Sequence, residues 1–96
     1  MTTNQEAIAI RQAEVANYDA NIAIYEAILA DLPTTWPSRL EQFRGRKDHQ
    51  QAATECDTAD IELLAKLLYR EQCEAAIKTE TLERTKAAAI LKAIGG

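Results

Sequence analysis

The sequence predicts an all-α protein: an antiparallel hairpin of two long helices, joined by a short middle helix and completed by dimerisation. Large apolar residues recur every seven positions over residues 8–32, which is typical of a helix that packs along another helix. The 96 residues include only three glycines and two prolines, and both prolines flank one short segment. Few turns and one break favour a few long helices in a single domain.

The order of elements follows from these breaks. We expect a helix over about 4–32, a turn over 33–36, a short helical segment over about 37–56 and a long helix over about 58–94. Pro33 disfavours helical geometry in the residue before it, and Gly95 and Gly96 end the last helix. Whether residues 46–57 form helix or loop stays open, although the sequence favours helix over most of them.

The first helix carries the clearest pattern. The first and fourth positions of its seven-residue repeat are mostly large and at least partly apolar, so they predict an interaction seam. The seam residues are Ile8, Val15, Tyr18, Ile22, Tyr25, Leu29 and Leu32.

The other sides of this helix are also apolar. Alanine fills the second and sixth positions of every repeat, and Ile10, Ile24 and Ile28 fall on a third side. A helix that is apolar on most sides is usually covered on most sides. The alternative is that alanine raises helix propensity on an exposed face. We favour the covered arrangement, in which this helix is central and contacted from several directions.

The turn holds the single tryptophan, Trp36. We expect it to plug the corner between helices; an anchor for a partner is the alternative, because tryptophan is enriched at binding hot spots. In the segment after it, Leu40 and Phe43 fall on one face and Gly45 provides a stop.

The last helix has two apolar stripes that do not align. Ile61, Leu64, Leu67 and Leu68 form the first, and Ile90, Leu91 and Ile94 form the second. A polar stretch separates them, so we expect a bend or a change of packing partner near residues 79–81. Three i,i+4 pairs of opposite charge predict a continuous solvated face: Glu62/Lys66, Glu74/Lys78 and Glu80/Arg84.

Composition favours oligomerisation. Hydrophobic residues make up 47% of the chain, but many are alanine and aromatics are only 5%. A chain of this size with a thin core of large side chains gains stability from long helix contacts or from a second copy. We therefore expect a homodimer with a core like that of a four-helix bundle.

Charge limits the partners. The net charge is −4, which argues against general affinity for nucleic acid or anionic membranes, and no apolar run is long enough to cross a membrane. One basic cluster has aromatic residues interleaved, which can hold phosphates while a ring stacks on a base. We favour pairing of this cluster with acidic side chains. Its residues are possible partner contacts: Trp36, Arg39, Phe43, Arg44, Arg46 and Lys47.

No pattern indicates catalysis, a metal or a cofactor. The best metal candidates are His49, Cys56, Asp57, Cys73 and Glu74. They lack the short cysteine or histidine pairs that hold zinc, so we expect no metal site. Cys56 lies seven residues after His49, the single histidine, and would share its face if the segment were helical, but no orienting group or oxyanion hole is indicated. We expect no enzyme.

These observations favour a non-enzymatic protein–protein interaction module, a subunit or adaptor of a cytoplasmic assembly. Two cysteines without a secretion signal favour reduced thiols in the cytoplasm. Two alternatives stay open: a small acidic inhibitor that docks on a larger complex, such as one that handles nucleic acid, and a nucleic-acid-binding regulator that uses Arg39–Lys47. The partner's identity is not indicated.

Overall fold

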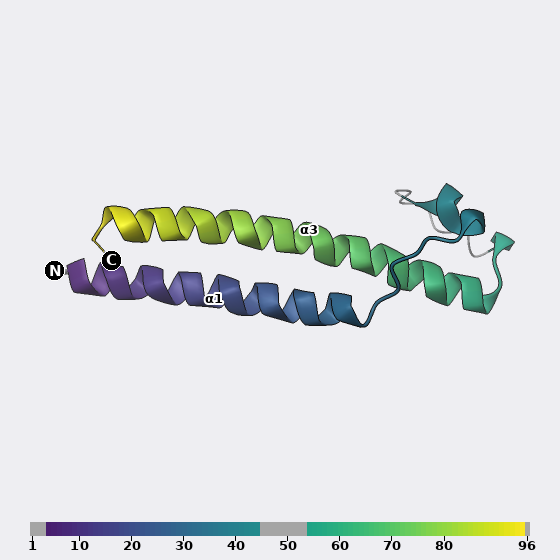
Figure 1. Cartoon of the computed structure of the whole chain (residues 1–96), viewed down its shortest axis with the longest axis horizontal. Coiled ribbons are helices and arrows are strands. Elements are labelled where there is room, and N and C mark those ends of the chain that lie inside the picture. Colours follow the sequence, from purple (N-terminus) through teal and green to yellow (C-terminus); the bar gives the residue numbers. More distant parts are fainter. Residues whose placement is uncertain (1–3, 45–53, 96) are drawn as a thin grey trace.

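The computed structural model describes residues 4–44 and 54–95. In these ranges every regular element is a helix: α1 (Asn4–Ala30), the 3-10 helix η1 (Ser38–Phe43) and α3 (Thr58–Ala93). Figure 1 shows α1 and α3 side by side and antiparallel, with both chain ends at the same end of the hairpin. The predicted all-helical fold with two packed long helices is confirmed.

Helix α1 ends two residues earlier than expected. The amides of Asp31 and Leu32 donate to the carbonyls of Ile28 and Leu29, at 3.1 and 3.2 Å, so the chain tightens into i to i−3 bonds before it leaves the helix. Pro33 follows at once and cannot continue the helix.

Helix α3 is continuous over 36 residues. The carboxylate of Asp57 caps it by accepting from the Asp60 amide at 2.8 Å. At the other end Gly95 adopts a positive φ of 96°, which glycine tolerates without strain. In the polar middle the Thr79 and Thr85 hydroxyls donate to the backbone carbonyls four residues before them, so these side chains are accommodated within the helix.

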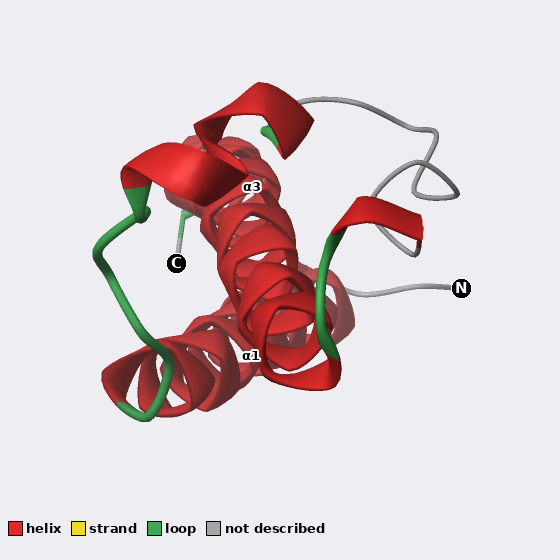
Figure 2. Ribbon diagram, turned by 90° about the vertical axis from the view of Figure 1, so that its right-hand side faces the viewer, coloured by secondary structure: helices red, strands yellow, loops and turns green. Residues whose placement is uncertain are grey.

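The hairpin is long and narrow, with extents of 62 × 23 × 19 Å. Helix α3 extends past the end of α1, and there η1 lies against it (Figures 1 and 2). The core at this corner consists of Leu40 and Phe43 from η1 with Leu64 and Leu67 from α3, each at most 3% exposed.

The first stripe of α3 and its other buried residues face different partners. Leu64 and Leu67 pack on η1, whereas Cys73 and Ala87 are buried farther along the helix, which packs on α1. Of the second stripe, Leu91 and Ile94 are half-buried and Ile90 is exposed. The packing partner therefore changes between Leu67 and Arg70, about ten residues before the position that the sequence predicted. Helix α3 continues through residues 79–81 without interruption.

The prediction that α1 is covered from several directions is not met within the chain. No residue of α1 is buried, all seven alanines of the repeat are exposed, and the Ile10 and Ile24 residues are 57% and 58% exposed. The physical reason is that α3 packs along one side of α1 and leaves the others open.

The expected segment over about 37–56 differs from a regular α-helix. Residues Ser38–Phe43 form a 3-10 helix, and Arg44 leaves it in an extended conformation. The helix favoured over 48–55 lies mostly outside the described residues, which include only its last two positions, both helical.

Candidate interaction surfaces

The predicted seam of α1 lies on the side that faces α3. All of its residues are half-buried, as are Arg11, Glu14, Asn21 and Ile28 beside them. Because only one helix packs along α1 in the described part of the chain, the seam is occupied by α3. The sequence predicted it as an interaction seam, and its contact here is within the chain.

Two polar contacts join the helices from opposite edges of α1. From one edge, the Asn21 amide donates to a carboxylate oxygen of Glu80 at 3.5 Å. At the other edge, the Arg84 guanidinium donates to the Asp19 carboxylate and forms an ion pair with it. The expected pair of Glu80 with Arg84 is thus replaced by two contacts that reach across to α1.

At the corner, Trp36 is half-buried and packs against the core cluster of η1 and α3. The Arg44 guanidinium lies over its ring, 5.1 Å from the ring centre, in a cation–π contact. This placement agrees with a plug that closes the corner. Phe43 is 1% exposed, so it serves the core and is not open to a partner.

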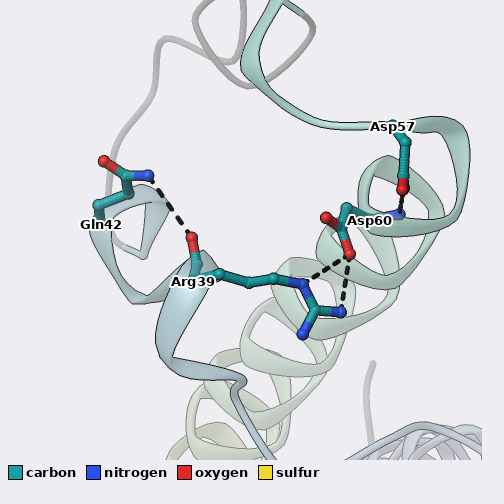
Figure 3. A network of polar contacts seen from close by, with 4 residues as sticks. All are labelled: Arg39, Gln42, Asp57 and Asp60. Carbon is teal, nitrogen blue, oxygen red and sulfur yellow. Dashed lines mark hydrogen bonds and ion pairs between the residues drawn. The ribbon is translucent and has the colours of Figure 1, made fainter.

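Arginines of the predicted basic cluster are paired with acidic residues of α3. The Arg39 Nε donates to Asp60 Oδ1 at 2.9 Å, within a small network that also includes Gln42 and Asp57 (Figure 3). The hydrogen bond and the charge of Asp60 raise the pKa of the Arg39 guanidinium. Arg44 pairs with Glu71 at 2.8 Å.

The remaining two members of the basic cluster, Arg46 and Lys47, lie outside the described residues, and so does His49. Of the cluster's cations, then, the two that the structure describes both have an acidic partner. Their charge is directed at α3, which reduces what they offer to phosphate groups.

The cysteines are free thiols. Cys73 is buried, and Cys56 is half-buried against the corner core. Removal of water around Cys56, together with the nearby carboxylates of Asp60 and Glu55, raises the pKa of its thiol. A raised pKa lowers the thiolate fraction at neutral pH, opposite to what a nucleophile needs.

The described part of the chain has no cluster of metal ligands, and the hollow found in it is open to solvent. Among residues 4–44 and 54–95 no three histidine, cysteine or acidic side chains are grouped as metal ligands would be. An open hollow of about 470 Å³ lies where the end of α1 and the following turn approach the start of α3. Asp31, Glu62 and Lys66 are the charged residues that line it.

Six large hydrophobic residues are exposed in the hairpin: Ile10, Ile24, Ile61, Tyr69, Leu82 and Ile90. The sequence indicated Ile10 and Ile24 by their position outside the seam, but it gave no role to Tyr69. Tyr69 could have been assigned to this surface only if the side of α3 that faces α1 had been known. That side is marked partly by polar residues, which a hydrophobic pattern does not reveal.

No described helix combines the length and apolar character needed to cross a membrane. Comparisons of the chain with protein-family models, curated proteins and solved structures found no match.

Proposed function

We propose that this chain is a non-enzymatic protein–protein interaction module, a subunit or adaptor of a cytoplasmic assembly, and that it works as a homodimer. The observation that carries the proposal is the large surface that the hairpin leaves exposed. The chain exposes 6757 Å², whereas a compact monomer of its mass exposes about 5,500 Å². The difference, about 1,300 Å², exceeds the roughly 800 Å² that each partner buries in a standard interface.

The shape of the chain supports the same proposal. Its radius of gyration is 19.4 Å, against about 12 Å for a compact domain of this length. In the described residues only six side chains form the buried hydrophobic core, and none of them comes from α1. Two-helix hairpins gain stability when further helices cover their apolar sides.

The alternatives have weaker support. An acidic inhibitor that imitates phosphates needs unpaired rows of carboxylates, but Asp19, Asp60 and Glu71 are paired with arginines. A nucleic-acid regulator needs free cations, and Arg39 and Arg44 are engaged by α3. Free thiols at Cys56 and Cys73 agree with the reducing environment that we propose.

The test is recovery of the tagged chain from its native host at native expression level, with sedimentation equilibrium of the purified chain. We expect self-association, together with a protein that copurifies in fixed ratio and stays bound in high salt, because apolar contacts are not screened. A monomer that recovers no protein in fixed ratio would contradict the proposal.

A further inference from the structure

Four of the six exposed large hydrophobic residues of the hairpin lie on one of its two broad sides: Ile10, Ile24, Tyr69 and Ile90. Ile10 and Ile24, with the half-buried Ile28, lie on the edge of α1 that holds Asn21, because they are eleven, three and seven residues from it along the helix. Glu80 lies seven residues from the buried Cys73 and Ala87, so it faces α1 directly; Tyr69 and Ile90 lie beside it on the edge of α3 that holds Glu83, fourteen and seven residues away. These five residues are called the isoleucine face below.

Contacts between the helices place both edges on the same side. The Asp19–Arg84 ion pair joins the opposite edges of the two helices, so the edge with Ile24 and Ile28 lies on the same side as the edge with Tyr69 and Ile90. Tyr69 also lies beside Cys73 and Tyr25, whose proximity raises the pKa of its phenol. The isoleucine face therefore spans both helices of the hairpin.

The opposite broad side is polar. It holds the Asp19–Arg84 ion pair, and Gln12 and Glu26 lie seven residues on either side of Asp19. The corner helix also avoids the isoleucine face, because its ion pairs reach Asp60 and Glu71, which lie on other sides of α3. The isoleucine face is thus the open apolar side of the hairpin.

The antiparallel register fixes which residues are level. Asn21 lies at the same height along the hairpin as Glu80, and Asp19 at the same height as Arg84. Because the helices are antiparallel, lower residue numbers in α1 are level with higher residue numbers in α3. Ile10 is then level with Ile90 near the chain ends. Tyr69 is level with the end of α1, where Arg70 contacts the Leu29 carbonyl, so Ile28 lies nearest to it and Ile24 lies one turn farther along α1. Between this apolar zone and the one at Ile10, Glu14 is level with Lys86.

We infer that the isoleucine face binds the same face of a second copy of this chain, with α1 of each copy over α3 of the other. This inference rests on the proposed self-association and specifies its surface. The surface that the chain exposes beyond that of a compact monomer, about 1,300 Å², is large enough for an interface with a partner of this size. Charge selects the arrangement: α1 holds four acidic residues and one basic residue, whereas α3 holds six of each, so stacking α1 on α1 would oppose two acidic helices.

In this arrangement the faces complement each other. A two-fold axis parallel to the helices brings Ile10 of one copy to Ile90 of the other, and Glu14 to Lys86. The apolar residues of each copy then contact apolar residues of the other copy. Between them, the acidic Glu14 of one copy contacts the basic Lys86 of the other. The result is a four-helix bundle in which neighbouring helices are antiparallel.

The first test is a pair of matched charge substitutions, followed by sedimentation equilibrium. Ile10→Glu with Ile24→Glu changes residues that are 57% and 58% exposed in the hairpin. The dimer dissociation constant should rise about 100-fold, because apolar hot-spot contacts are lost and charge is buried. The control is Leu82→Glu, at a residue that is 55% exposed but points away from α1, two residues from both Glu80 and Arg84. It should change the constant by no more than about twofold.

The outcomes separate the two proposals. A wild-type chain that stays a monomer overturns the self-association and the face together. A wild-type dimer that tolerates the Ile10 and Ile24 substitutions, or that is dissociated by Leu82→Glu, overturns the face alone. Circular dichroism of each variant, with unchanged helix content, shows that the hairpin is intact.

The second test is disulfide formation between separately prepared variants. Ile10→Cys mixed with Ile90→Cys should form a cross-linked pair of chains, identified by peptide mapping, and each variant alone should form little. A disulfide needs Cα atoms within about 7 Å, so it reports the arrangement directly. Cross-linking of Ile10→Cys with Ile24→Cys, and not with Ile90→Cys, would indicate α1 on α1 and overturn the arrangement.

Discussion

Arg70 of α3 reaches the end of α1, where its Nη1 donates to the carbonyl oxygen of Leu29 at 3.2 Å. The last carbonyls of a helix have no partner within it, and they carry partial negative charge. Arg70 also pairs with Glu74 at 2.9 Å. One arginine therefore joins the two long helices at the point where the packing partner of α3 changes.

Arg70→Met should lower the free energy of unfolding by about 1–2 kcal/mol, because a charged hydrogen bond is lost while the apolar stem is kept. The measurement is urea unfolding followed by circular dichroism at one fixed chain concentration, since a dimer's stability depends on concentration. Lys78→Met, at an exposed residue, is the control and should change stability by less than about 0.5 kcal/mol. Equal effects of both variants would show that the Leu29 contact contributes nothing.

Leu67→Ala should cost about 2–4 kcal/mol of stability, because Leu67 is fully buried in the small corner core and the truncation leaves a cavity. Leu82→Ala, at a residue 55% exposed, should cost less than about 0.5 kcal/mol. Chemical denaturation of both variants compares them. If Leu67→Ala cost no more than Leu82→Ala, the corner would not be part of the cooperative fold.

The Cys56 thiol should react with iodoacetamide more slowly at neutral pH than the same thiol in guanidinium. Its pKa is raised by loss of water and by nearby carboxylates, so the thiolate that reacts is formed only at higher pH. The pH dependence of the alkylation rate, read by peptide mass, should have its midpoint shifted upward in the folded chain. Faster reaction at pH 7 when folded than when unfolded would contradict this environment.

The chain should not bind single-stranded DNA or RNA at about 50 mM salt, the condition in which phosphate contacts are strongest. Arg39 and Arg44 are held by acidic residues of α3, and the net charge is −4. Fluorescence anisotropy with a labelled oligonucleotide measures this. Saturable binding that weakens with added salt, and that is lost in the double variant R39A/R44A, would restore the regulator hypothesis.

The hairpin could be predicted from the sequence because period-seven spacing and the proline-flanked break are local signals. Ile8, Val15 and Ile22 mark the inward side of α1 without any knowledge of its partner. The first stripe of α3 was visible for the same reason, although the helix that covers it, η1, is shorter and tighter than expected.

The phase of α3 against α1 could not be predicted, because its inward positions include charged residues. Arg70, Glu80 and Arg84 face α1, and a hydrophobic pattern does not mark them. Local spacing favoured a Glu80–Arg84 pair within the helix, but both side chains contact residues of α1 instead. Without that phase, Tyr69 and Ile90 could not be assigned to the same side as Ile10.

Sedimentation equilibrium of the purified wild-type chain at micromolar concentration is the most direct test of the central claim, that the hairpin is half of an interface. It reports mass without depending on shape, which matters for a particle 62 Å long. We predict about twice the chain mass of 10.6 kDa. A single species at the monomer mass across the micromolar range would contradict the claim.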